Sequence, residues 1–171
     1  MKQLSIKKYA LLSAIILIGI GLDQLTKYLA VKFLTPIPTL PIIKGVIHLT
    51  YVENRGAAFG MLADSRWVFM IISTVAILGM IAFLFSGMSQ NILYDISLAI
   101  VISGGIGNMI DRVALGYVVD MIDFRLINFA VFNVADSFVC VGAGLLILAL
   151  ILDIIKDSKA KKENENASDG K

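Results

Sequence analysis

The chain has 171 residues, of which 58% are hydrophobic and 16% are charged, and its mean hydropathy is +0.85. This composition is too apolar for an ordinary soluble domain, so it predicts an integral membrane protein and excludes a large soluble domain. The formal net charge of +2 is too small, and its cations too scattered, to predict nucleic-acid binding.

Four stretches of the chain are apolar enough to cross a membrane, which takes about 20 residues of helix. They are residues 9–34, 67–85, 92–110 and 130–152. The first is too long for the apolar region of a cleaved signal peptide and lacks a convincing small-residue cleavage site, so we expect it to remain as a span. The sequence therefore predicts an all-α membrane protein with one domain over residues 1–155.

An even number of spans places both chain ends on one side of the membrane. Lysines flank the spans at both ends, which favours a cytoplasmic location for the termini, although four cations also lie in the loop on the opposite side. The end lysines are Lys2, Lys7, Lys8, Lys156, Lys159, Lys161 and Lys162. Residues 156–171 are rich in Lys, Glu, Asn and Ser and predict a disordered cytoplasmic tail.

The first span carries Asp23 and Lys27, four residues apart and hence on one helix face. Asp23 lies roughly 21 Å along the helix from Tyr9, toward the outer side of the membrane. The pair is either a structural ion pair or a contact to a substrate. In the outer loop, residues 35–66, the β-branched and aromatic run 46–52 predicts a small strand or hairpin on the membrane surface. The chain's one histidine, His48, falls in this run and predicts an interfacial side chain rather than a metal ligand.

The third span ends in a glycine-rich and polar segment. Ser103 and Gly107 form a small-xxx-small pair that lets another helix approach closely. Asn108 and Arg112, four apart, share a face and either anchor the helix end at the outer interface or belong to a site. Asp95, near the other end of this span, is interpreted as a charge that favours a helix N-terminus.

Asp120 and Asp136 are the strongest candidates for chemistry, because ionisable groups kept near hydrocarbon are functional candidates by default. They lie 16 positions apart, on one side of the membrane, with a loop between them that can fold back. The alternatives remain open from spacing alone: Asn133 could cap the fourth helix with Asp136 at its third position, and Asp120 could be an ordinary loop acid.

Two carboxylates that share one proton can hydrolyse an amide, since one takes a proton from water while the other donates to the carbonyl oxygen. The two carboxyl groups would then lie roughly 3 to 6 Å from each other, bridged by one water molecule. Such chemistry requires no metal or cofactor, and none is expected. Cys140, the only cysteine, is expected to be a packed thiol.

Five segments in order resemble the lipoprotein signal peptidases, the signal peptidase II family of bacterial membrane aspartic peptidases. The segments are residues 23–27 (DQLTK), 54–60 (NRGAAFG), 104–112 (GGIGNMIDR), 118–120 (VVD) and 132–137 (FNVADS). The resemblance implies four transmembrane helices with an extracytoplasmic β-cradle between the first two. It also implies that the chain cuts diacylglyceryl-modified prolipoproteins on the N-terminal side of the lipid-modified cysteine.

The resemblance further implies roles for particular residues. The catalytic residues would be Asp120 and Asp136. The substrate-binding residues would be Asn54, Asn108, Arg112, Asn133 and Ala135, and the supporting residues Asp23, Lys27, Gly56, Gly104 and Gly107. The protein would be a monomer in the bacterial cytoplasmic membrane, in contact with membrane lipids, with its active site near the extracytoplasmic face.

Two other functions are compatible with embedded acids. A small proton-coupled transporter would use them as a relay, but its site is expected near the midplane between repeated halves, whereas here the polar residues gather toward one face and no internal repeat is found. A non-catalytic assembly partner would explain Ser103 and Gly107 but not the outer cluster of Asp, Asn and Arg.

Overall fold

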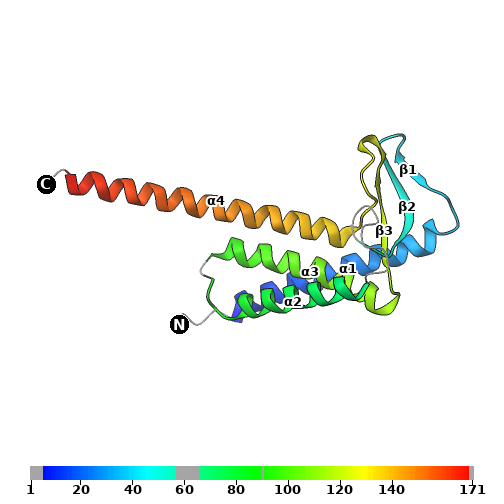
Figure 1. Ribbon diagram of the computed structural model, residues 1–171, viewed down its shortest axis with the longest axis horizontal. Helices are drawn as coiled ribbons and strands as arrows, with labels where there is room; N and C mark the ends of the chain where they lie inside the picture. The colour runs from blue at the N-terminus through cyan, green and yellow to red at the C-terminus, as the bar shows by residue number, and fades with distance from the viewer. Residues whose placement is uncertain (1–5, 57–65, 90, 170–171) are drawn as a thin grey trace.

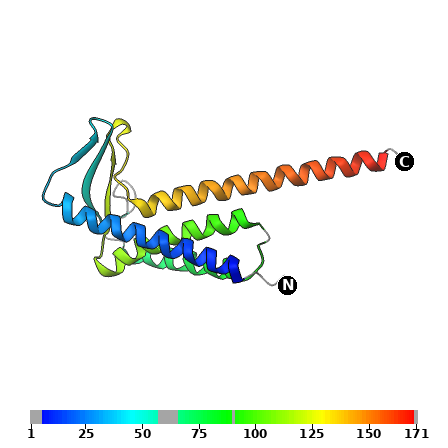
Figure 2. The same ribbon diagram turned by 180° about the vertical axis from the view of Figure 1, so that it is seen from behind.

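The computed structural model describes residues 6–56, 66–89 and 91–169. Over these ranges four helices run along one another, and a small sheet stands across one end of them (Figure 1). The helices are α1 (Ile6–Leu34), α2 (Arg66–Phe85), α3 (Ile92–Ala114) and α4 (Val134–Asp169); the strands are β1 (Leu40–Ile43), β2 (Ile47–Asn54) and β3 (Val118–Phe124), and a 3-10 turn, η2 (Arg125–Ile127), follows β3. The reverse view shows the sheet at the end where α1 and α3 finish and α4 begins (Figure 2).

The helices have the composition of membrane spans. Helices α1, α3 and α4 are each long and apolar enough to cross a bilayer, and α2 adds a shorter apolar stretch, Met70–Phe85, within the residues that the structure describes. Large apolar side chains such as Ile71, Val75 and Ile147 are exposed on the helices, as expected where the surrounding solvent is lipid. The predicted four-helix membrane architecture is confirmed.

Helix α3 lies in the middle of the bundle and packs against α1, α2 and α4. Its N-cap residue is Asn91, whose side chain accepts a hydrogen bond from the backbone N–H of Leu93 at 2.9 Å. Its buried Ala99 and Ile102 share an apolar core with Leu12 of α1 and Leu84 of α2. The helix that carries Asn108 and Arg112 is therefore held on three sides.

The sheet is antiparallel in the order β1-β2-β3. Strands β1 and β2 form a hairpin that turns at Gly45, where φ is +77°, a conformation that glycine adopts without steric cost. The strand or hairpin predicted over residues 46–52 is thus confirmed. The third strand, β3, was not predicted; it pairs with β2 and places Asp120 opposite Val52.

A turn at the end of α3 directs the chain into β3. The carbonyl of Asp111 accepts hydrogen bonds from the backbone N–H groups of Leu115 and Gly116, and Gly116 has a φ of +86°, the left-handed conformation that commonly ends a helix. Beyond it, Val119 and Met121 of β3 pack with the last turns of α1 in a second apolar core. This core fixes the sheet to the bundle.

After η2 the chain returns to β3 instead of forming a free loop. Phe132 exchanges two backbone hydrogen bonds with Ile122, of 2.8 and 3.1 Å. Because of this return, α4 begins at Val134, four residues later than the span predicted over 130–152. The predicted fold-back of this segment is confirmed, and it brings Asn133 and Asp136 toward the strand that carries Asp120.

Helix α4 extends past its apolar part to Asp169, whereas the sequence predicted disorder over residues 156–171. The physical reason is that Ala, Lys and Glu favour helix and that extending an existing helix avoids the cost of nucleation. The segment leads away from the rest of the bundle (Figure 1).

Candidate active site

Asp120 is 1% exposed and accepts hydrogen bonds on both carboxylate oxygens. Asn54 of β2 donates from Nδ2 to Oδ2 at 2.9 Å, and Asn133 donates from Nδ2 to Oδ1 at 2.6 Å. Asn54 reaches Asp120 because Val52 pairs with Asp120, which makes Asn54 its diagonal neighbour across the two strands. The backbone N–H of Gly56 donates to Oδ1 of Asn54 at 3.0 Å, so the Asn54 amide is held with its NH2 group toward Asp120.

Asp136 lies in the first turn of α4 and exchanges hydrogen bonds with Asn133. Oδ1 of Asn133 accepts from the backbone N–H of Asp136 at 2.9 Å, and Oδ2 of Asp136 accepts from the backbone N–H of Asn133 at 3.3 Å. This is a reciprocal helix cap, so the capping role left open by the sequence is confirmed. The other oxygen, Oδ1, accepts from Nδ2 of Asn108 at 2.7 Å, which places Asp136 in the same polar cluster as Asp120.

Asn133 contacts both carboxylates and is fully buried. Its side-chain NH2 donates to Asp120 and to Oδ1 of Asn108, at 2.6 and 3.1 Å, while its backbone N–H donates to Asp136. One residue therefore binds both acids of the predicted pair. Two carboxyl groups held by one residue in a site shielded from solvent can titrate as a unit that shares one proton.

The pKa of Asp120, which lies outside the membrane-spanning helices, is raised from 3.8 to about 6. Burial is the largest cause. The hydrogen bond from Asn54 opposes it, and the nearby charge of Asp136 raises the pKa further, while Asn133 and the charge of Lys27 lower it. A carboxyl group with this pKa can carry a proton close to neutral pH.

A groove of about 600 Å³ opens beside Asp136. Its polar lining includes Asn54, Asn108 and Arg112, and its wall is apolar, with Phe129, Ala130, Val131, Phe132, Val139 and Val141 among its residues. Three of the five predicted substrate-binding residues thus face the groove.

The other two predicted substrate-binding residues, Asn133 and Ala135, are fully buried. Asn133 donates hydrogen bonds to both carboxylates from the protein interior and does not line the groove. Cys140 corrects a prediction, because it is exposed on α4 and lines the groove instead of being packed.

Four of the five predicted supporting residues, Asp23, Lys27, Gly104 and Gly107, lie where the helices meet, and Gly56 follows β2. Asp23 and Lys27 form the predicted ion pair at 2.9 Å. A Cβ on Gly104 would collide with the carbonyl oxygen of Ala135, and one on Gly107 with the carboxylate of Asp23, so both glycines permit the close helix packing that the sequence predicted. Residues 57–60 of the second motif lie outside the described residues.

Sequence reasoning assigned no role to two residues that join this cluster, Gln24 and Asp111. Nε2 of Gln24 donates to Oδ1 of Asp111 at 3.0 Å, and Lys27 pairs with Asp111 at 3.0 Å. The signal was present in part: Asp111 is three residues after Asn108, which places the two on one helix face.

The family model described as signal peptidase (SPase) II matches residues 15–152. The chain is 55% identical to the lipoprotein signal peptidase of Caldanaerobacter subterraneus subsp. tengcongensis, over 73% of this chain and 85% of that one. It is 46% identical to the lipoprotein signal peptidase of Clostridioides difficile, over 80% of this chain and 92% of that one. Its fold is similar to that of a bacterial membrane enzyme solved by the in meso method at 2.3 Å resolution, with a TM-score of 0.78 and 30% identity over 85% of this chain and 90% of that one.

Proposed function

The chain belongs to the signal peptidase II family of aspartic peptidases, and from that premise we propose that Asp120 and Asp136 are its catalytic pair. It is a bacterial multi-pass membrane protein with lipoprotein signal peptidase activity, which removes signal peptides from prolipoproteins. This membership sets aside the alternative of a proton-coupled transporter. The observation that carries the catalytic assignment is that Asn133 donates hydrogen bonds to both carboxylates.

In the proposed reaction the two carboxyl groups hold one proton between them. The ionised group accepts a proton from a water molecule as the water oxygen attacks the scissile carbonyl carbon, and the protonated group donates to the carbonyl oxygen. When the tetrahedral intermediate collapses, the C–N bond breaks and the leaving nitrogen receives a proton from the pair, while a hydroxyl group of the intermediate returns a proton to the pair as the C=O bond re-forms. Because the two groups titrate as a unit, the roles of base and acid belong to the pair.

The groove beside Asp136 is the proposed binding site for the substrate. Its apolar wall suits an apolar signal peptide segment and the acyl chains of a diacylglyceryl cysteine, and cleavage would fall N-terminal to that cysteine. Asn54, Asn108 and Arg112 supply the polar contacts that fix the scissile peptide.

The proposed placement has both termini in the cytoplasm and the sheet at the extracytoplasmic face of the cytoplasmic membrane. It is supported by the lysines that flank the start of α1 and follow the apolar part of α4. The start of α1 lies at the end of the bundle away from the sheet, and α4 runs past that same end (Figure 1). Residues 1–155 would then carry the peptidase, and residues 156–171 would extend into the cytoplasm.

Cleavage of a lipid-modified precursor by purified Asp120→Asn and Asp136→Asn variants tests this proposal. Each variant is expected to lose about 100- to 10,000-fold in kcat, the contribution of a general acid or base, while its unfolding temperature shows that it is folded. The matched control is Asp123→Asn on the same strand, whose carboxylate pairs with Arg125 at 2.8 Å instead of joining the site. Turnover near the wild-type rate in either Asp120→Asn or Asp136→Asn would show that the assignment is wrong.

A further inference from the structure

The residues directly before the two catalytic aspartates are held in the same way. The backbone N–H of Val119, which precedes Asp120, donates to Oδ2 of Asp111 at 3.0 Å. The backbone N–H of Ala135, which precedes Asp136, donates to Oδ1 of Asp23 at 3.0 Å. Each segment that carries a catalytic residue is therefore tied to a buried carboxylate of another element.

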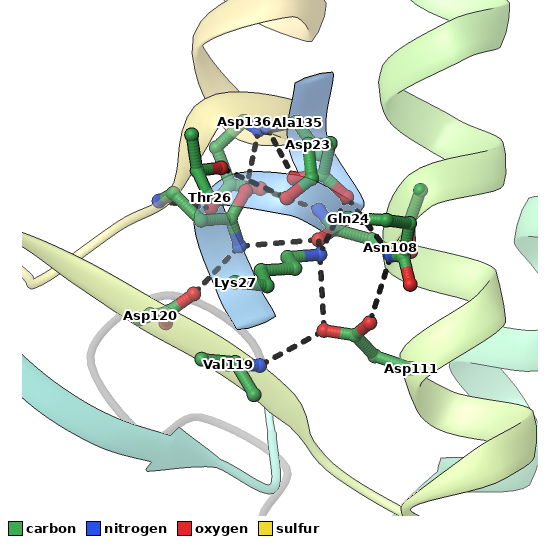
Figure 3. Close-up of polar contacts among 12 residues, drawn as sticks. Asp23, Gln24, Thr26, Lys27, Asn108, Asp111, Val119, Asp120, Ala135 and Asp136 are labelled. Carbon is green, nitrogen blue, oxygen red and sulfur yellow. Dashed lines mark hydrogen bonds and ion pairs between the residues drawn. The ribbon is translucent and has the colours of Figure 1, made fainter. Parts of the chain in front are cut away.

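Lys27 joins these two carboxylates. Its Nζ lies 2.9 Å from Oδ2 of Asp23 and 3.0 Å from Oδ2 of Asp111, with all three side chains at least 95% buried. Its remaining hydrogen bond goes to Oδ1 of Asn108 at 2.9 Å, which uses all three donors of the ammonium group. Figure 3 shows Lys27 between Asp23, Asp111 and Asn108. We call Asp23, Lys27 and Asp111 the ion triplet.

The contact with Asn108 also fixes which end of that amide faces the catalytic pair. Because Nζ of Lys27 can only donate, it holds the Asn108 oxygen toward itself and leaves Nδ2 to donate to Asp136. Gln24 closes the triplet on the α1 side by donating to Asp111 and to the carbonyl of Gly107, at 3.0 and 3.2 Å. The triplet is thus saturated with hydrogen bonds.

Burying three charges contributes little net stability, since replacing such a group by apolar side chains is often neutral or stabilising. A geometric role accounts better for its arrangement. We propose that the ion triplet sets the separation of the two catalytic carboxyl groups, with Asp111 and Asp23 as positioning residues that hold the backbone at Val119 and Ala135. This inference rests on the proposed catalytic pair.

The separation matters because sharing one proton depends on the distance between the carboxyl groups. A displacement of about 1 Å can cost about 100-fold in rate. It also weakens the coupling that drives the two apparent pKa values apart, so the pH range in which the pair holds one proton becomes narrower. A residue that only stabilised the fold would change neither kcat per folded molecule nor the width of that range.

Two substitutions of Asp111 distinguish the effect of where its acceptor oxygen lies from the effect of its negative charge. Asp111→Asn keeps an oxygen in place for Val119 and Lys27 and loses only the hydrogen bond from Gln24, whose Nε2 also donates to Gly107 and Asp23. Asp111→Glu keeps the charge but moves the acceptor by one methylene. We expect Asp111→Asn to retain kcat within about 10-fold and Asp111→Glu to lose about 100-fold, with KM little changed because Asp111 does not line the groove. The pH profile of kcat should narrow for Asp111→Glu.

The matched control is Asp95→Asn on the same helix. Asp95 is fully buried and pairs with Lys8 at the other end of the bundle, so its loss should lower the unfolding temperature and leave kcat and the pH profile unchanged. The inference is overturned if Asp111→Glu keeps wild-type kcat and profile width, or if Asp111→Asn loses as much as Asp111→Glu. Either result, obtained while Asp120→Asn and Asp136→Asn are inactive, refutes the positioning role and leaves the catalytic pair intact.

Discussion

The carboxyl group of Asp120 is cut off from solvent and lies near a second acid, and these two effects outweigh the hydrogen bonds from Asn54 and Asn133 that favour its charged form. Its pKa of about 6 in the folded protein is above the ordinary value of 3.8, so the folded state binds the proton more tightly than the unfolded state does. The resulting stabilisation is fully present below about pH 4 and is lost as the pH rises to about 6. The change is on the order of 2 to 3 kcal/mol.

The loss of this stabilisation with rising pH gives a prediction for thermal unfolding in detergent. Asp120→Asn removes the titrating group, so the variant should gain unfolding temperature relative to the wild type between pH 5 and pH 7.5. The measurement is the difference between the two unfolding temperatures at each pH. A difference that is the same at both values would contradict the raised pKa.

Asp123 supplies the control for that experiment. Burial alone would raise the pKa of Asp123. This pKa is nevertheless lowered, because Arg125 and Thr50 donate hydrogen bonds to the Asp123 carboxylate. Its contribution to stability is therefore lost only as the pH falls below about 4. The difference between wild type and Asp123→Asn should stay constant from pH 5 to pH 7.5.

At this scale the sequence singled out the two aspartates as candidates and offered the Asp23–Lys27 ion pair and the Asn133 cap as alternatives, because each follows from a motif or from helical spacing. The contacts of Asp111 did not follow, since its partners include a lysine on another helix and the backbone N–H of Val119. A backbone N–H group is present in every residue except proline, so a sequence pattern cannot show which one donates to Asp111.

At the scale of elements, the distance between α3 and α4 depends on Gly104. A Cβ there would meet the carbonyl oxygen of Ala135 and lie 2.9 Å from Cγ2 of Val139, and backbone cannot move aside cheaply. Gly104→Ala is therefore expected to push the start of α4 away from α3, costing about 1 to 3 kcal/mol as an overpacked contact does. Both the unfolding temperature and kcat should fall.

Gly21 on α1 is the matched control, because a Cβ added there meets nothing within 4 Å. Gly21→Ala should raise stability by up to about 1 kcal/mol, the helix preference of Ala over Gly, and keep full activity. If Gly104→Ala behaved like Gly21→Ala in both measurements, the close packing of α3 on α4 would not be needed for the site.

The elements that the sequence missed depend on contacts between distant segments. Strand β3 has four consecutive buried residues, Val118 to Met121, so it lacks the alternation that marks a strand in sequence. Its extended form is fixed by pairing with β2 and by the return of Phe132. The four spans were predictable because their length and composition are set by the thickness of the bilayer.

At the scale of the whole molecule, the proposed topology places the catalytic pair at the outer surface. The sheet, the end of α3 and the start of α4 meet at one end of the bundle, away from the two chain termini (Figures 1 and 2). A protease at this depth can meet a signal peptide that still lies in the bilayer.

Reporter fusions test this orientation. A fluorescent protein fused to the C-terminus should fluoresce, because that end is expected in the cytoplasm, and alkaline phosphatase at the same position should be inactive. Alkaline phosphatase inserted at Lys44, between β1 and β2, should be active. The reverse pattern would invert the topology and place the site on the cytoplasmic side.

The central claim is that Asp120 and Asp136 act as one catalytic unit, and the cleavage rate of the double variant Asp120→Asn/Asp136→Asn tests it most directly. Residues that act together lose their function together, so the double variant should cleave a lipid-modified precursor no more slowly than either single variant. A shared-proton pair would be contradicted if both single variants retained measurable turnover and the double variant were slower by the product of the two single effects on the cleavage rate.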